Sequence, residues 1–289
     1  MKLALKFNFI IITVLLLGYL IAGYASYYVL KKNAQQEILE RANLLMESAQ
    51  AVRKYTVEEI KPLLTVQNKR QFLPQTVSAY AAVQTFLHLQ KNHPEYSYRE
   101  ATLNPTNLRD RAVDWESDII QNFSKNEKEV FTTTERDTPS GRLFYVARPI
   151  RITDPACLSC HSTPDAAPAT MLEKYGSANG FGWKVNEVVG AQIISVPMAI
   201  PIKNAEKAFM TFMSILGIIF LLVIVILNIL LRAMVTKPIV QMANMADRIS
   251  KGEPDLPEFS ETGKSEIAVL GAAFNRMKRS LEQAMKMLE

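Results

Sequence analysis

Two long runs of apolar residues interrupt an otherwise mixed sequence. The first, residues 7–30, and the second, residues 208–231, each hold 24 residues without a charged side chain. A helix needs about 20 such residues to cross the hydrocarbon core of a bilayer, so both runs are predicted to be transmembrane helices. The rest of the chain then divides into a short N-terminal segment (1–6), a central domain (31–207) and a tail (232–289).

The pattern of the central domain changes along its length. Residues 33–68 are rich in Gln, Glu, Ala, Leu and Arg with apolar residues at helical spacing, which predicts a helix that Pro62 ends or bends. A second helix is predicted for residues 74–90. β-Branched and aromatic residues then dominate four segments, which predicts strands at 96–103, 130–135, 142–150 and 187–196. Long helices followed by a small sheet indicate an α+β fold.

The tail contains two amphipathic segments joined by a polar connector, which spans Gly252 to Gly263 and includes Pro254. The first segment is marked by Ile239, Met242, Ala246 and Ile249. The second carries apolar residues at alternating gaps of three and four, which is a heptad pattern. These residues are Ile267, Leu270, Phe274, Met277, Leu281, Ala284 and Leu288. Two such helices cannot bury both rows of apolar side chains alone, so we expect a parallel homodimer that forms a four-helix bundle. The alternative is a pair of amphipathic helices that lies on membrane lipid.

The formal net charge of +5 is concentrated beside the first apolar run. Residues 1–32 carry four Lys and no acidic residue, residues 33–207 carry 20 basic and 20 acidic groups, and the tail carries 9 basic and 8 acidic groups. This distribution is typical of a membrane flank and excludes a nucleic-acid-binding protein. The small residues at 22–25 also allow a cleaved signal peptide, but the length of the first run and the presence of a second favour its retention.

The only two cysteines lie in the run Cys157-Leu158-Ser159-Cys160-His161. C-x-x-C-H is the attachment signature of c-type haem. Two thiols one helical turn apart can form thioethers with the two vinyl groups on one porphyrin edge, and the adjacent imidazole then ligates the iron. We therefore predict one covalent haem c, attached through Cys157 and Cys160, with His161 as the proximal iron ligand.

Three other interpretations of the cysteines stay open. They could form a zinc site with His88 and His93, they could form a disulfide, or the motif could occur by chance. Covalent haem further implies the bacterial periplasm, where c-type haem is attached. The prediction is therefore a two-pass protein of the bacterial inner (plasma) membrane, with the central domain in the periplasm and both termini in the cytoplasm.

The second axial position of the iron has several candidate ligands. Met46 lies on the helix that leaves the first span, and Arg53 follows seven residues later on the same face. Met46 is thus a candidate distal ligand and Arg53 a candidate contact for a haem propionate. Met46 could instead fill a gap in the core, and Arg53 could be a solvated surface charge. The other distal candidates are His88, His93, Met171, Met198 and an open position.

At these residues the chain resembles two known families. Residues 233–286 resemble a HAMP domain, through Pro238, Glu266-Ile267, Leu270, Phe274-Asn275 and Met277. The central region resembles a bacterial family, common in cyanobacteria and proteobacteria, with a PAS-like periplasmic c-type haem domain of unknown function. The matching segments are Arg53-Lys54-Tyr55-Thr56, Leu103-Asn104-Pro105, Asp114-Trp115-Glu116, Cys157 to His161, Ala167-Pro168, Tyr175-Gly176, Gly180-Phe181-Gly182-Trp183, Gly190 and Val196-Pro197. The resemblance implies a haem redox or small-ligand sensor in which the helix carrying Met46 can supply the distal ligand. Some members of the family use Cys there, and this chain has no cysteine on that helix.

Together these features predict a membrane-anchored redox or gas sensor. Its HAMP bundle would pass the signal to a separate output protein, such as a histidine kinase or a chemotaxis-type transducer. No catalytic set is evident, so we expect that the protein is not an enzyme. The alternatives are a membrane-tethered c-type cytochrome in electron transfer and a haem-free chemoreceptor in which the two cysteines form a disulfide.

Overall fold

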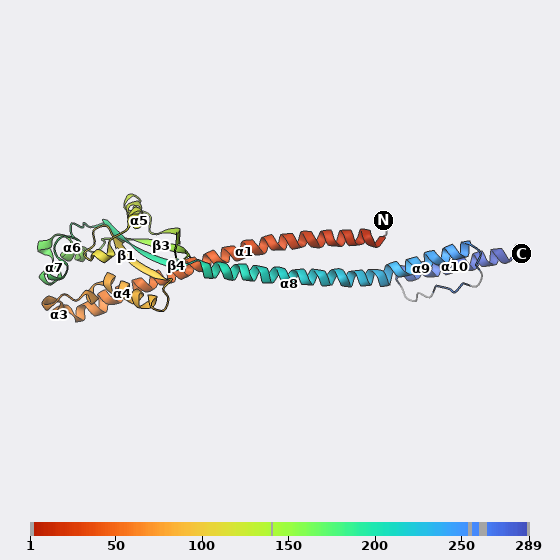
Figure 1. Cartoon of the computed structure of the whole chain (residues 1–289), viewed down its shortest axis with the longest axis horizontal. Coiled ribbons are helices and arrows are strands. Elements are labelled where there is room, and N and C mark those ends of the chain that lie inside the picture. The colour runs from red at the N-terminus through yellow and green to blue at the C-terminus, as the bar shows by residue number, and fades with distance from the viewer. Residues whose placement is uncertain (1–2, 140, 254–255, 260–264, 288–289) are drawn as a thin grey trace. The chain divides into compact units, whose positions relative to one another are not determined.

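The computed structural model describes residues 3–139, 141–253, 256–259 and 265–287 (Figure 1). The chain forms two compact units. One consists of Val29–Lys207, and the other of Met1–Tyr28 with Ala208–Glu289. Helix α1 (Leu3–Tyr55) and helix α8 (Ala199–Leu231) each contribute residues to both units.

The centre of the first unit is a four-stranded antiparallel sheet with the order β1-β4-β3-β2. Its strands are β1 (Ser97–Thr102), β2 (Thr132–Thr138), β3 (Gly141–Arg151) and β4 (Val188–Pro197). All four predicted strands are confirmed, with ends that differ by a few residues. Together with the long helices the sheet makes the α+β fold that the sequence predicts; the PAS-like topology stays a prediction.

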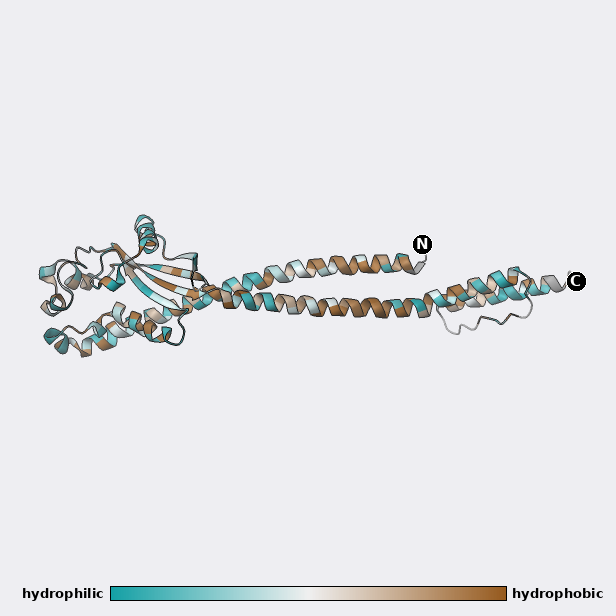
Figure 2. Ribbon diagram, viewed as in Figure 1, coloured by the Kyte–Doolittle hydropathy of each residue, from teal (hydrophilic) through white to brown (hydrophobic). Residues whose placement is uncertain are grey.

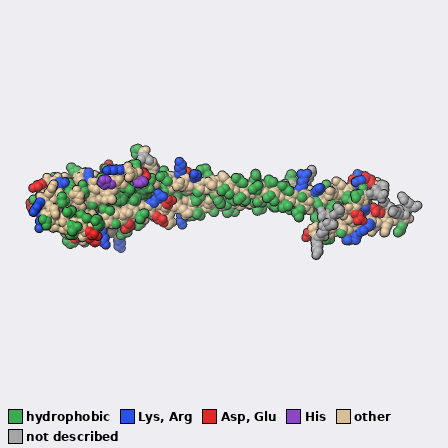
Figure 3. Space-filling view, turned by 90° about the horizontal axis from the view of Figure 1, so that it is seen from below, with side chains coloured by type: hydrophobic (Ala, Val, Ile, Leu, Met, Phe, Trp, Pro, Cys, Tyr) green, Lys and Arg blue, Asp and Glu red, His purple; other side chains and the backbone are tan. Residues whose placement is uncertain are grey.

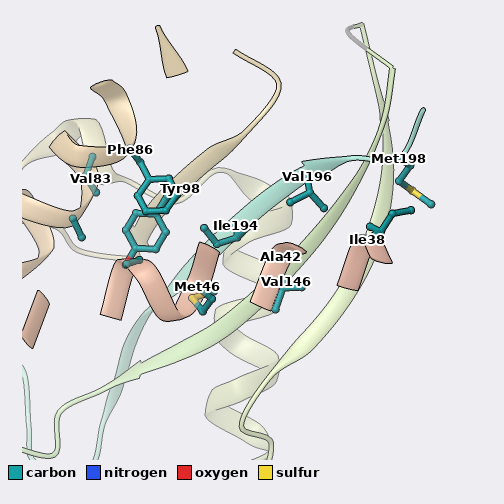
Figure 4. Close-up of a cluster of buried hydrophobic side chains, with 12 residues drawn as sticks. Ile38, Ala42, Met46, Val83, Phe86, Tyr98, Val146, Ile194, Val196 and Met198 are labelled. Atoms are coloured by element: carbon teal, nitrogen blue, oxygen red, sulfur yellow. The ribbon is translucent and has the colours of Figure 1, made fainter. Parts of the chain in front are cut away.

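Helices pack on both faces of this sheet. One buried cluster joins Ile38, Ala42 and Met46 of α1 and Phe86 of α4 (Ser78–Gln90) to strand residues such as Ile194 (Figure 4). A second cluster joins Ile120 and Phe123 of α5 (Asp114–Lys125) to Ala147, Ala191 and Ile193. Neighbouring strand residues point to opposite faces, which is why Ile193 and Ile194 belong to different clusters. Helix α5 was not among the predicted elements.

The long helix changes geometry before Pro62. Five residues, Thr56–Ile60, form a π-helical segment (η1), in which the Lys61 amide bonds the carbonyl of Thr56 five residues earlier. Two short helices follow, α2 (Lys61–Leu63) and α3 (Thr65–Arg70), with a break at Leu64. Proline has no N–H and its ring clashes with the carbonyl four residues earlier, so a wider turn in front of it relieves the clash. The prediction that Pro62 bends or ends the helix is confirmed.

The remaining elements of this unit are short helices in the connections around the sheet. They are η2 (Pro74–Thr76), η3 (Leu108–Asp110), η4 (Pro155–Cys157), α6 (Leu158–His161), η5 (Pro164–Ala166) and α7 (Ala169–Tyr175). Four of them, η4, α6, η5 and α7, lie between β3 and β4. Helix α7 packs toward α3, and the rings of Phe72 and Tyr175 meet edge to face at 5.8 Å.

The second unit contains the two apolar runs. Both lie in helices that are long and apolar enough to cross a membrane. Figure 2 shows that hydrophobic residues predominate along these segments, and Figure 3 shows hydrophobic side chains on their surface. The helices contact each other through Tyr19, whose ring lies 6.1 Å from that of Phe220 and whose hydroxyl donates to the Met213 carbonyl at 3.3 Å. Gly23 leaves room for the Met213 side chain on the same side.

The tail forms a second π-helical segment, η6 (Arg232–Thr236), followed by α9 (Lys237–Ser250) and α10 (Glu266–Lys286). Like the first π segment, η6 comes directly before a Lys-Pro pair. The Asn275 side chain holds the connector, because it accepts from the Phe259 amide and donates to the Phe259 carbonyl, both at 2.9 Å. Leu270, Met277 and Leu281 of the heptad pattern remain 51%, 58% and 44% exposed. Pro254, Gly263 and Leu288 lie outside the described residues.

Candidate functional site

The two cysteines lie on consecutive short helices between β3 and β4. Asp154 begins the segment as an N-cap, since its side chain accepts from the Ala156 amide at 2.8 Å. Cys157 ends the 3₁₀ turn η4, and Cys160 lies on α6. Both are free thiols with partly exposed side chains. The segment therefore presents two unpaired sulfur atoms about one helical turn apart, as thioether attachment requires.

His161 is held on two sides. Its Nδ1 lies 2.7 Å from the carbonyl oxygen of Gly180, which can only accept, so Nδ1 carries the proton. The ring of Trp183 stacks on the imidazole, with centroids 3.8 Å apart and planes inclined by 10°. Burial lowers the pKa of His161, and the bond to Gly180 only partly opposes this shift. The lowered pKa favours the neutral imidazole, in which the Nε2 lone pair can ligate a metal.

The backbone around His161 joins α6 to the segment before β4. The Gly182 amide donates to the Ser162 carbonyl at 2.9 Å, and the Trp183 amide donates to the His161 carbonyl at 3.2 Å. These two bonds bring residues 180–183 alongside the C-x-x-C-H segment. The sequence pattern identifies both segments but indicates no role for Gly180 or Trp183.

Charged side chains of the long helix lie near the first cysteine. Burial raises the pKa of the Cys157 thiol, and the negative charge of Asp154 raises it further. The positive charges of Arg53 and Lys61 oppose this by stabilising the thiolate. Arg53 is thus close enough to Cys157 for its charge to act on the thiol. Its role as a propionate contact stays a prediction.

Arg53 also forms a buried polar network with the sheet. Its guanidinium pairs with Glu100, and the two side chains are 23% and 5% exposed. The hydroxyl of Tyr98 donates to the other carboxylate oxygen of Glu100 at 2.6 Å. Burial, with the charge of Glu100, raises the pKa of Tyr98 well above its ordinary value, so the hydroxyl remains a donor. Arg53 is therefore not a solvated surface charge.

Lys61 was missed by the sequence analysis for a geometric reason. It follows Arg53 by eight residues, which on an ideal α-helix places the two side chains about 80° apart. The π turn at Thr56–Ile60 adds one residue without adding rotation, so the separation falls to about 20°. Both cations therefore lie on one face of the helix. Only the local change of helix type reveals this.

Met46 lies in the first buried cluster, on the face of α1 that covers the sheet (Figure 4). Its side chain is completely buried, and the cluster contains no residue of the segment between β3 and β4. Core packing alone therefore accounts for its burial. As the distal iron ligand Met46 stays a prediction. The other distal candidates divide into two exposed histidines and two buried methionines, namely His88, His93, Met171 and Met198.

The zinc alternative gains no support from the geometry. Among the residues that the structure describes, no group of three or more His, Cys, Asp and Glu side chains is placed to hold a metal ion. His93 instead approaches Glu95 at 3.8 Å. The chemistry of the cysteine segment fits covalent haem better, because two free thiols, one neutral imidazole and two nearby cations match the vinyl groups, the iron and the propionates.

Comparison with known families follows the same division of the chain. Residues 31–197 match the family model described as Tll0287-like, which is more than half of the 289 residues. The chain belongs to the Tll0287-like family. Residues 230–283 match the HAMP domain model. The predicted combination of these two families, a Tll0287-like domain and a HAMP domain in one chain, is confirmed.

Among solved structures, the chain is similar to one described as the crystal structure of the cyanobacterial heme-protein Tll0287. The identity is 16%, the match covers 56% of this chain and 95% of that chain, and the TM-score is 0.42. No curated protein matches the chain. The HAMP domain associates the Tll0287-like domain with signal transduction, and the two apolar helices fit a membrane protein.

Proposed function

We propose that the Tll0287-like domain carries one haem c, attached through Cys157 and Cys160 and ligated on its proximal side by His161. The observation that carries this proposal is the state of His161, whose Nδ1 is held by the Gly180 carbonyl, while Nε2 has no hydrogen-bond partner among the residues that the structure describes. When bound, haem supplies an iron centre that can change its oxidation state or its ligand. The match to a family that includes a heme-protein also supports the proposal.

The two cations near Cys157 suit the acidic edge of the porphyrin. A haem carries two propionates, and Arg53 and Lys61 offer one positive charge each. The guanidinium of Arg53 has five N–H groups, so it can hold Glu100 and still contact a propionate. Arg53 thereby keeps the role that the sequence suggested, and Lys61 joins it.

The proposed role of the whole chain is a haem-based redox or gas sensor of the bacterial inner membrane. Its central domain would lie in the periplasm, with both termini in the cytoplasm. The HAMP domain would relay the signal to a separate output protein, and we propose no enzymatic activity. The signal would pass through the core, where Ile38 of α1 and Met198, directly before α8, belong to the same buried cluster (Figure 4).

The tail supports the dimeric part of the proposal. The apolar positions Leu270, Met277 and Leu281 remain exposed on α10, although they follow a heptad pattern. A second copy of the chain would bury them in a four-helix bundle. A change at the iron would then be transmitted as a shift between two packings of that bundle.

The haem proposal has a direct test. The full chain is expressed with the periplasmic haem-attachment machinery, and its intact mass and its reduced absorption spectrum in alkaline pyridine are measured. We expect one added haem per chain and a spectrum typical of two thioether bonds. Replacing both cysteines by Ser should abolish the added mass. As a control, replacing the exposed His93 by Ala should leave the added mass unchanged. A colourless wild-type protein of unmodified mass would contradict the proposal.

A membrane-tethered cytochrome is the alternative function, and the signalling test separates the two. Single cysteines placed at exposed positions of α10 are crosslinked with the haem oxidised and reduced. A sensor changes the crosslinking pattern with the redox state, and His161→Ala removes the change. A pattern that never depends on the redox state would favour electron transfer.

A further inference from the structure

We propose that Asn104 and Trp183 are positioning residues for the proximal ligand, and that they set the redox properties of the haem through His161. This inference rests on the proposed function, because it assumes that His161 ligates iron. Neither residue has an assigned role in the sequence motifs. They act on His161 from two directions, one through the Gly180 carbonyl and the other through the face of the ring.

Asn104 fixes the peptide that carries the Gly180 carbonyl. Its Oδ1 accepts from the Gly180 amide at 3.2 Å, and its Nδ2 donates to the Phe181 carbonyl at 3.3 Å. The two bonds lie on either side of the 180–181 peptide group, so together they oppose its rotation. Asn104 lies 76 residues before Gly180 in the chain, so this bridge depends on tertiary structure.

Gly180 itself is suited to this position. It has a φ of +84°, which L side chains rarely adopt, and it is buried. A Cβ atom there would lie 2.1 Å from the Oγ1 and 2.8 Å from the Cα of Thr106. The backbone of residue 180 is thus clamped between Asn104 and Thr106. Its carbonyl therefore has little freedom to move away from His161.

Trp183 restrains the other degree of freedom of the imidazole. The hydrogen bond to Gly180 selects the tautomer and one in-plane direction, but it leaves the ring free to tilt about that bond. Stacking at 3.8 Å with an inclination of 10° removes the tilt. The Trp183 amide also donates to the His161 carbonyl, which keeps the indole beside its partner.

The direction of the effect follows from the hydrogen bond. An imidazole whose Nδ1–H is held by a carbonyl is more basic, and a more basic ligand favours ferric over ferrous iron. Loosening the Gly180 carbonyl therefore raises the midpoint potential. Asn104 follows Thr102, which pairs with Gly190 at the start of β4, and the other end of this strand leads into α8.

The experiment uses the full-length, haem-loaded chain in lipid nanodiscs. Asn104→Ala and Trp183→Leu are compared with the matched controls Asn122→Ala and Trp183→Phe. Asn122 is an exposed asparagine of α5, and its side chain hydrogen-bonds to the side chains of Asn126 and Glu129. Midpoint potential and the ferric electron paramagnetic resonance spectrum are measured, with haem content as a separate readout.

We expect full haem content in all four variants, an upward shift of the midpoint potential in Asn104→Ala, and altered ferric spectra in Asn104→Ala and Trp183→Leu. The two controls should match the wild type. Wild-type potentials and spectra in both test variants would overturn the inference while leaving the haem proposal intact. Wild-type protein without covalent haem would overturn both.

A second measurement does not need haem and guards against a variant that fails to load it. The chain has only three histidines, so nitrogen-15 labelling of histidine in the full chain with both cysteines replaced by Ser gives few signals. We expect His161 to show a single Nδ1–H tautomer, and Asn104→Ala to show a mixture of tautomers. An unchanged tautomer in Asn104→Ala would overturn the role of Asn104.

Discussion

Replacing Met46 distinguishes core packing from iron ligation. Its side chain is 0% exposed and packs among apolar residues of α1 and the sheet. Truncation to Ala removes three heavy atoms from a packed site, which costs about 2–5 kcal/mol of unfolding free energy. Leu nearly conserves the volume, so Met46→Leu should cost less than about 1.5 kcal/mol. Leu44→Ala is the matched control, because Leu44 lies on the same helix but is 69% exposed, and it should change stability by no more than about 0.5 kcal/mol.

The assay exploits the two tryptophans. Trp115 and Trp183 both lie in the central domain, so their fluorescence reports its unfolding by urea within the full chain. The absorption spectra of the haem-loaded variants are recorded alongside. If packing is the role of Met46, Met46→Leu keeps both the stability and the spectrum. Equal losses of unfolding free energy in Met46→Ala and Leu44→Ala would refute the packing argument. A changed spectrum in a stable Met46→Leu protein would instead identify Met46 as the distal ligand.

Three further predictions test other parts of the molecule. In the haem-free chain whose only thiol is Cys157, the alkylation rate should rise with pH through a midpoint above the ordinary thiol pKa, because burial raises the pKa of Cys157. Lys61→Gln should move this midpoint to higher pH, because it removes a cation that stabilises the thiolate. An unchanged midpoint would show that Lys61 does not act on Cys157. Met277→Glu should shift the chain from dimer toward monomer in analytical ultracentrifugation, since it charges a 58%-exposed heptad position. Glu116→Ala should lower the unfolding free energy by about 1.5–3 kcal/mol in urea titrations, because the 2%-exposed carboxylate bonds Arg99 at 3.0 Å; a change within error would argue against that pair.

The sequence determined those features that depend on local periodicity or on bonded spacing. The two apolar runs, the four strands and the heptad pattern of α10 follow from the composition or periodicity of short stretches of sequence, and the strands agree with the observed sheet. The C-x-x-C-H run is likewise local, because the spacing of two thiols and an imidazole within five residues is set by a single helical turn. The positions of the charged residues along the sequence also show that the excess positive charge lies beside the first apolar run.

Tertiary structure decided what surrounds those features. Gly180 and Asn104 reach His161 only because β1 and the segment before β4 are neighbours in the fold, and no sequence period connects positions 104, 161 and 180. Lys61 joins Arg53 on one helix face because a proline forces a π turn, which a simple helical pattern does not anticipate. Met46 shows the converse, since its helical spacing from Arg53 suggested a shared ligand face, whereas packing against the sheet buries it among apolar side chains. The residues that form chemical bonds with a cofactor can be recognised from spacing, but the residues that orient them are chosen by long-range packing.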